Sequence, residues 1–379
     1  MILSSPSSSF RVLAFGAYLK NRACLIDGGK PHWSKLHGDL SNPKACLALY
    51  DSARQLTDDA SGPLDLLVHD MHPDFYSSLL ASNLSLSTGV PSIAVQHHHA
   101  HIGSVMAEYE LEGAYLGLAL DGAGWGADQE IWGGELLLVE GCNYQRVGHL
   151  SRLALPGGDK AADQPWRMAA SALHLLGRCD EISKRLSNWT SKENAELVRV
   201  MLNKDLNCPL TSSAGRWFDA AAALLGLCGT QVHEAQAAQL LESAASLWLN
   251  KNPDAVSSGL AQITDNLVLD LSPVVEKLLD TSEGLVDRAA AQFHLELVDG
   301  LVRWVLMAID KGPKISGICL SGGCFHNKIL RERLKNELES NKLNVYIPNI
   351  ENSDCGDAGL ALGQSWVGIQ YLKRGKTLD

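Results

Sequence analysis

The sequence predicts a two-lobed α/β protein in which a helical region interrupts the second lobe. Its 379 residues are enough for two packed lobes with separate cores. The first third of the chain reads as three strands followed by alternating helices and strands, and the same order starts again after residue 115. Within the second half, residues 163–304 are rich in Ala and Leu at helical spacing, which predicts an inserted helical region.

The first lobe is predicted to span residues 1–115. Short apolar runs separated by glycine turns predict its strands, and longer runs with apolar residues every three or four positions predict its helices. The expected order is strands over 11–19, 22–29 and 32–36, a helix over 44–55, a strand over 64–70, a helix over 75–81, a strand over 92–96 and a helix from about residue 97.

The second lobe is predicted to span residues 116–379. The expected order is strands over 116–126, 130–141 and 145–155, the helical insertion, a strand over 316–323, an amphipathic helix over 325–340, a strand over 344–348 and a closing helix over 357–369. Repetition of one order suggests a duplicated RNase H-like lobe. The pattern is that of the actin, sugar-kinase and acetate-kinase superfamily, in which a nucleotide lies between the lobes.

The composition argues against several classes of protein. A net charge of −11 disfavours the basic surface that binds nucleic acid without regard to sequence. No apolar run approaches the roughly 20 residues of a membrane span, and the opening MILSSPSSSF lacks the basic and apolar regions of a signal peptide. Nine irregularly spaced cysteines without a CxxC pair predict neither a disulfide framework nor a zinc finger. We therefore expect a cytoplasmic protein with no membrane or nucleic-acid partner.

Four histidines within five residues are the most informative feature of the chain. If a helix begins near His97, then His97 and His101 lie one turn apart on one face, where both can bind one metal ion. A structural cluster of neutral histidines at a helix start is the alternative. Two imidazoles with one or two carboxylates suit Zn²⁺ or Fe²⁺ and leave room for an exogenous oxygen ligand. The sequence gives no role for His98 or His99.

Three further segments have the residues of an anion or metal site. Asp121 is expected at the end of an apolar strand before a glycine turn, where a carboxylate can hold a metal, although many such turns are only turns. The segment 321–327, SGGCFHN, joins a strand to a helix and offers N–H groups to a phosphate, or is simply a tight connection. Asp354 and Asp357 precede the closing helix, where at least one is expected to cap it. The residues alone thus predict a metal-assisted nucleotide or acyl-phosphate site.

Read together, the motifs closely resemble those of HypF carbamoyltransferases, and specifically their C-terminal TsaD-like domain. The matching runs follow the order of that family and cover nearly the whole chain. They are VLAFGAYLKN, SKLHGDL, LLVHDMHPDFYSS, AVQHHHAHIGSVMAE, LALDGAGWG, IWGGELLL, LPGGDKAADQPWRMA, SSAGRWFDAAAALLGL, EAQAA, LSGGCFHN and DAGLALGQ.

The resemblance implies the residues of two adjoining sites. The divalent metal, zinc or iron, would be held by His97, His101, Asp121 and Asp357, which are also the implied catalytic residues. The adenylate of an ATP-derived intermediate would lie against a second set, formed by Gly322, Gly323 and Asn327, with Asp159, Asp219 and Glu234 around the ribose.

Mild departures from the family pattern concern mainly the nucleotide. Ala235 stands where the family usually has glycine, in HEAQAA in place of EGQAA. DAG at Asp357 replaces the commoner DGG, and Cys324 and His326 occupy positions that more often carry an aliphatic residue and glutamine. These changes are expected to affect nucleotide affinity more than the chemistry.

The implied activity is transfer of the carbamoyl group of carbamoyl-adenylate to the C-terminal cysteine of HypE, a step in making the cyanide ligands of nickel–iron hydrogenases. Signatures of the acylphosphatase, zinc-finger and YrdC-like domains are missing from these residues, so the sequence is interpreted as a fragment or a short form. A separate YrdC-like protein is then the expected source of carbamoyl-adenylate. The alternatives are an O-carbamoyltransferase acting on a small-molecule hydroxyl, a TsaD-type enzyme modifying tRNA, which the acidic charge disfavours, and a non-catalytic nucleotide-binding scaffold.

Overall fold

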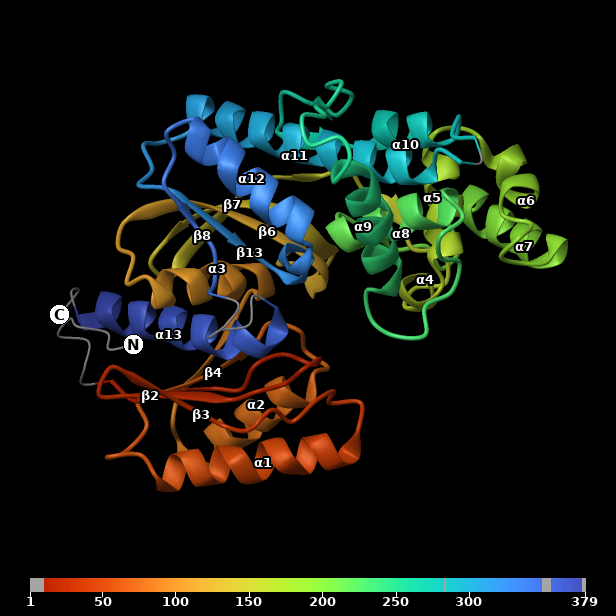
Figure 1. The fold of residues 1–379 in the computed structure, drawn as a ribbon. Coiled ribbons are helices and arrows are strands. Elements are labelled where there is room, and N and C mark those ends of the chain that lie inside the picture. The colour runs from red at the N-terminus through yellow and green to blue at the C-terminus, as the bar shows by residue number, and fades with distance from the viewer. Residues whose placement is uncertain (1–9, 283, 350–355, 377–379) are drawn as a thin grey trace.

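A computed structural model of the chain describes residues 10–282, 284–349 and 356–376. It contains two twisted sheets, one in each lobe, with helices α3 (His97–Glu108) and α13 (Leu360–Lys376) packed together between them (Figure 1). Among these described residues, no helix combines the length and the apolar character that a membrane span requires.

The first sheet has the strand order β3-β2-β1-β4-β5. Its first three strands are antiparallel, whereas β4 and β5 run parallel to β1, so the carboxyl ends of β4 and β5 lie at one edge. The elements of this half besides α3 are β1 (Val12–Ala14), β2 (Cys24–Asp27), β3 (Lys30–Trp33), α1 (Pro43–Asp58), β4 (Leu66–Asp70), α2 (Tyr76–Thr88) and β5 (Ser92–Val95).

The second sheet repeats this order as β8-β7-β6-β13-β14, with β12 and β11 added beyond β8. Two sheets with one topology confirm the predicted fold class of duplicated RNase H-like lobes. The elements outside the insertion are β6 (Ala114–Trp125), β7 (Ile131–Glu140), β8 (Asn143–Leu150), β9 (Leu153–Ala154), β13 (Ile318–Ser321), η3 (Gly323–His326), α12 (Lys328–Ser340), β14 (Val345–Tyr346) and η4 (Asp357–Gly359).

The insertion is less uniformly helical than its composition indicates. Three short strands, β10, β11 and β12, lie inside the range 163–304. Strand β12 pairs with β8, and β11 pairs with β12, while β10 pairs with both β9 and β7. Its last helix also continues to Lys311. The elements are α4 (Lys160–Asp163), α5 (Pro165–Leu175), η2 (Cys179–Glu181), α6 (Ile182–Arg185), α7 (Lys192–Asn203), β10 (Leu210–Thr211), α8 (Ala214–Leu224), α9 (Gln236–Leu249), β11 (Gln262–Ile263), β12 (Val268–Asp270), α10 (Ser272–Leu278) and α11 (Val286–Lys311).

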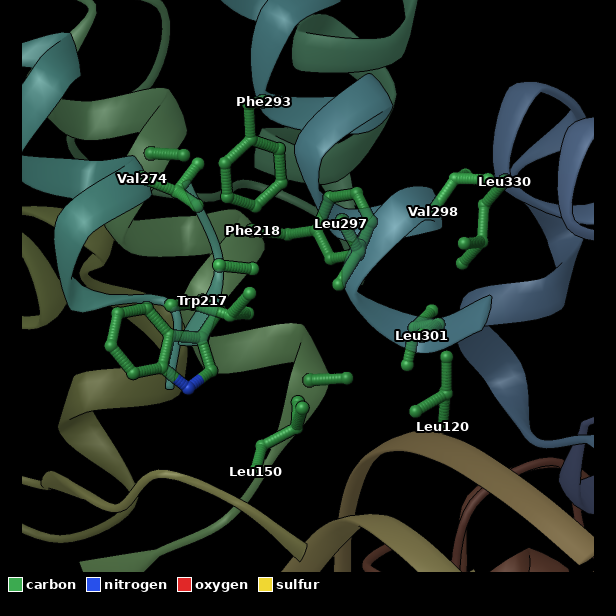
Figure 2. Close-up of a cluster of buried hydrophobic side chains, with 14 of the residues drawn as sticks. Leu120, Leu150, Trp217, Phe218, Val274, Phe293, Leu297, Val298, Leu301 and Leu330 are labelled. Carbon is green, nitrogen blue, oxygen red and sulfur yellow. The ribbon is translucent and has the colours of Figure 1, made fainter. Parts of the chain in front are cut away.

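One apolar core joins the insertion to the second sheet (Figure 2). Phe293, Leu297 and Leu301 repeat every four residues along α11 and are all buried. The ring of Phe293 meets that of Phe218 of α8 edge to face at 5.3 Å between centroids. Each such side chain contributes about 1.5 to 3 kcal/mol by leaving water, so the helical spacing read in the sequence fixes the insertion onto the sheet.

Strand β6 does not end at Asp121 as the sequence suggests. It continues to Trp125 beside β7, and its register shifts between Leu120 and Gly124, so that three residues bulge opposite one. The expected turn comes later, where Gly126 N–H donates to the Glu130 carbonyl at 2.9 Å. A bulge re-aims side chains without ending the strand, and here it presents the Asp121 carboxylate at the junction of the lobes.

The last helix of each half packs on the sheet of the other half. Helix α3 lies against β6 and β13, and α13 lies against β1 and β4. The two helices approach closely at Gly103 and Gly363, where a Cβ on Gly363 would overlap the Ala100 carbonyl. The predicted boundary at residues 115 and 116 falls just inside β6, but the two halves share this helical layer.

Candidate metal centre

The four predicted metal ligands lie together where the two halves meet. One donor atom of each lies within 4.8 Å of the others. His97 Nε2 is 3.3 Å from Asp121 Oδ2 and 3.7 Å from Asp357 Oδ1, and for His101 Nε2 these distances are 3.0 and 3.7 Å. Two imidazole nitrogens and two carboxylate oxygens in one cluster fit a divalent ion such as zinc or iron.

Each ligand is placed by a different part of the fold. The imidazoles of His97 and His101 project from the first turns of α3, Asp121 from the bulge in β6, and Asp357 from the first residue of η4. The two histidines and Asp121 are buried, whereas Asp357 is partly exposed. Of the four ligands, Asp357 is thus the one whose side chain is most exposed to solvent. Asp354, the other candidate cap of the closing helix, lies outside the described residues.

Asp70 orients His97, and sequence reasoning missed it. Its Oδ2 accepts a hydrogen bond of 2.7 Å from His97 Nδ1, and its side chain is fully buried. A carboxylate behind a metal-binding histidine fixes the ring so that the other nitrogen faces the metal. The available signal was that Asp70 ends β4, next to the strand whose end leads into the histidine helix.

Asp121 connects the metal centre to the glycine loop. Its Oδ2 faces the histidines, while Oδ1 accepts hydrogen bonds from Gly122 N–H at 2.8 Å and Gly323 N–H at 3.1 Å. Gly322, with φ +104°, passes so close to β6 that a Cβ would overlap the Leu120 carbonyl. Glycine is thus required at this position for contact with the strand, and the predicted metal and phosphate segments form one unit.

The charges of the centre are strongly coupled. Burial by itself would lower the pKa of His97, but Asp70, Asp121 and Asp357 together raise that pKa well above its ordinary value. Burial would likewise raise the pKa of Asp121, but His101 and His97 hold it well below the usual range. Without a metal His97 retains its extra proton, and a divalent ion that binds there must displace it.

His98 and His99 are not among the four clustered donors. Gln96 caps α3 by accepting from His99 N–H at 2.9 Å, and its Nε2 donates to His98 Nδ1 at 3.1 Å and to the Trp125 carbonyl at 3.0 Å. Burial lowers the pKa of His98 well below its ordinary value, and lowers that of His99 to about 4. Both rings are therefore neutral packing residues, as the structural alternative proposed for the cluster.

Asn327 holds the glycine loop in shape. Its Oδ1 accepts from Leu330 N–H at 2.9 Å and so caps α12, and its Nδ2 donates to His294 Nε2 at 2.9 Å. His294 in turn donates from Nδ1 to the Ala290 carbonyl at 2.8 Å. Desolvation lowers the pKa of His294 to about 4, so the ring stays neutral. Both polar side-chain atoms of Asn327 thus hold the loop in shape, and its predicted contact with the nucleotide stays a prediction.

The three residues expected around the ribose are not part of the metal cluster, since Asp159 precedes the insertion and Asp219 and Glu234 lie within it. Asp159 is exposed at the start of α4, and Asp219 is buried in α8, 2.8 Å from Arg216 Nε. Burial raises the pKa of Asp219 to about 6 against the opposing effect of Arg216. Glu234 is exposed and forms a 3.1 Å ion pair with Lys20 of the first half, so it bridges the two halves.

Known families match most of the chain. Residues 7–108 match the HypF Kae1-like domain, and residues 117–364 match the second subdomain of the carbamoyltransferase Kae1-like domain. The chain belongs to the HypF carbamoyltransferase family. Both matches agree with the resemblance drawn from the motifs, and they meet close to the start of β6.

Individual HypF relatives agree with this assignment. The chain is 47% identical over 369 residues to the "Carbamoyltransferase HypF homolog" of Cupriavidus necator, covering 96% of the chain and 93% of that relative. It is 42% identical to "Carbamoyltransferase HypF2" of the same organism, of which it covers 47%. The chain thus spans nearly all of one relative and about half of another.

Two solved HypF structures share the fold. One is full-length HypF in a phosphate- and nucleotide-bound form, at 29% identity, and the other is HypF of T. kodakarensis, at 28% identity. Each superposes with a TM-score of 0.84 over 96% of this chain, and the chain covers 47% and 48% of those proteins. The HypF-family fold therefore extends over nearly the whole chain.

Proposed function

We propose that this chain catalyses the transfer step of a carbamoyl relay, moving the carbamoyl group of carbamoyl-adenylate to the C-terminal cysteine of HypE. The observation that carries the proposal is the hydrogen bond of 3.1 Å between Gly323 N–H and Asp121 Oδ1. This bond fixes a loop suited to phosphate beside a cluster suited to a metal. Membership of the HypF carbamoyltransferase family supports carbamoyl transfer as the class of reaction.

The residues of the chain would hold the reacting groups in place. A divalent metal, when bound by the two histidines and two aspartates, supplies positive charge that stabilises negative charge on the oxygens of the adenylate. The hydrogen bond from His97 Nδ1 to Asp70 keeps His97 Nε2 directed at the centre. The hydrogen bond from Gly323 N–H keeps the Asp121 carboxylate next to the glycine loop. The glycine loop between β13 and α12, held against β6 by Asp121, would lie beside the phosphate.

The chemical step breaks one bond and forms one. The thiolate of the acceptor cysteine attacks the carbamoyl carbon, and the bond from that carbon to the phosphate oxygen breaks. AMP leaves with the electron pair, and the thiol proton goes to solvent. Binding both substrates at the junction of the two halves would supply the proximity that such a bimolecular reaction needs.

The test is mass spectrometry of HypE after incubation with this protein and supplied carbamoyl-adenylate. A mass gain of one carbamoyl group on the C-terminal cysteine is expected, and His101→Ala should abolish it. Carbamoyl phosphate and ATP alone should modify little HypE unless a separate YrdC-like protein is added. Failure to modify HypE with intermediate and metal present would refute the proposal, and carbamoylation of a small-molecule hydroxyl in its place would favour the O-carbamoyltransferase alternative.

A further inference from the structure

Four aromatic rings meet where the two halves of the chain adjoin, beside the metal centre but outside it. The rings of His72 and Phe75 stack at 4.1 Å with only 1° between their planes. Tyr18 stacks on Phe75 at 5.2 Å, and Trp125 tilts against His72 at 5.0 Å between centroids. Three of these rings come from the first half and Trp125 comes from the end of β6. We call these four residues the aromatic wall.

The aromatic wall is attached on both sides to groups that position the metal ligands. Asp70 accepts from His72 N–H through Oδ1 at 2.8 Å, while its Oδ2 holds the ring of His97. On the other side, Gln96, which caps the histidine helix, donates to the Trp125 carbonyl at 3.0 Å. One buried carboxylate therefore separates the wall from a metal ligand, and the wall adjoins the reaction centre.

His72 presents a directed hydrogen-bond donor. Its Nδ1 lies 3.2 Å from Asp74 N–H, which can only donate, so in the neutral ring the proton is on Nε2. No hydrogen bond of Nε2 to any described residue is present in the structure, and the His72 side chain is only half-buried. An N–H donor set among apolar ring faces suits a ligand that has an oxygen anion next to apolar side chains.

We propose that the aromatic wall seats the C-terminal tail of the carbamoyl acceptor, with His72 Nε2–H donating to the terminal carboxylate and the rings packing on the apolar side chains of the tail. This inference rests on the proposed function, in which the acceptor cysteine is the last residue of its chain. Its thiol and carboxylate are then carried by the same Cα, which matches a carboxylate donor beside a site of thiol chemistry. A small hydroxyl acceptor would leave most of the wall unused.

The test compares two synthetic peptides that copy the acceptor tail, one ending in a free carboxylate and one in an amide. Carbamoyl transfer to each is measured with wild type, with His72→Phe, which keeps the ring stack but removes the donor, and with the control His32→Phe, at an exposed site on β3. A hydrogen bond to a charged group predicts a KM about tenfold higher for the amide than for the acid with wild type. With His72→Phe the two peptides should have the same, raised KM, and His32→Phe should behave as wild type.

The outcomes distinguish a failure of the inference about the aromatic wall from a failure of the proposed function. Equal KM values for acid and amide with wild type would overturn the proposal, and this comparison needs no variant to fold. An acid preference that persists in His72→Phe would overturn the assignment to His72. If wild type modifies neither peptide nor intact HypE, the proposed function itself fails. If it modifies intact HypE and ignores amidation of the tail, only the inference about the wall is lost.

Discussion

Asp70→Asn tests the carboxylate behind the metal centre. The substitution keeps the shape of the side chain, removes the negative charge and leaves one oxygen, which can still accept from His97 Nδ1, for the two donors, His97 Nδ1 and His72 N–H, that the carboxylate satisfies. The metal would then be bound by a less basic imidazole in a more variable orientation. We expect Asp70→Asn to fold normally and to bind its divalent ion more weakly.

The magnitude follows from the geometry of the pair. The contact is short, at 2.7 Å, and both side chains are buried, so solvent screens the interaction little. Loss of such a partner typically weakens metal binding by about 10- to 100-fold. Because asparagine retains an acceptor, the expected effect lies near the lower limit, about tenfold in Kd, or about 1.4 kcal/mol.

The assay is competition for Zn²⁺ between the metal-free protein and a chromophoric chelator of known affinity. Asp51→Asn, an exposed aspartate of α1, is the matched control and should bind as wild type. A Kd for Asp70→Asn within twofold of wild type would refute the reasoning. It would mean that the helix alone, without the carboxylate, sets the orientation of His97.

Four further substitutions test other parts of the structure. His101→Ala should reduce bound metal from about one ion per chain to almost none by elemental analysis, with unchanged circular dichroism. His294 has a pKa of about 4 in the folded chain and an ordinary value near 6.5 when unfolded, so acid favours the unfolded state. His294 by itself should account for about 2 kcal/mol of the stability change between pH 7 and 5 in urea unfolding, and His294→Asn should lack that part of it. Gly363→Ala pushes a methyl group into the Ala100 carbonyl and should cost about 1 to 3 kcal/mol, seen as a lower Tm. Ala235→Gly should stabilise the chain by up to about 1 kcal/mol, because Ala235 has φ +59°, and a lower Tm would contradict that.

The metal ligands could be predicted because their signals are local or belong to family motifs. His97 and His101 are related by helical spacing, and Asp121 and Asp357 lie in glycine-rich motifs that the HypF family shares. Asp70 could not be found in this way. Its partner is 27 residues away, and an aspartate at the end of a strand has no local pattern that distinguishes it from a turn residue.

The bulge in β6 was missed for a related reason. Glycines after Asp121 favour a turn when read alone, but pairing of Gly124 with Trp132 on β7 keeps the strand going. Long-range packing also gives Gly322 a second role. The sequence assigns this glycine to phosphate binding, whereas the structure also requires it for contact with Leu120, so Gly322→Val is expected to disturb the metal centre and the phosphate loop together.

The exchange of α3 and α13 between the two halves has a consequence for biosynthesis. Strands β1 and β4 are complete within the first 70 residues, yet the helix that covers them begins at Leu360. At typical ribosomal speeds, that face of the sheet stays uncovered for tens of seconds, until the residues of α13 have been made. Asp357 directly precedes the same helix, so the nascent chain can assemble its fourth metal ligand only after the insertion and the second sheet have been made. A chain whose synthesis stalls before Leu360 would therefore expose an apolar sheet face, which makes it a substrate for chaperones and proteases. It would also lack one of the four ligands and so could not hold the metal prematurely.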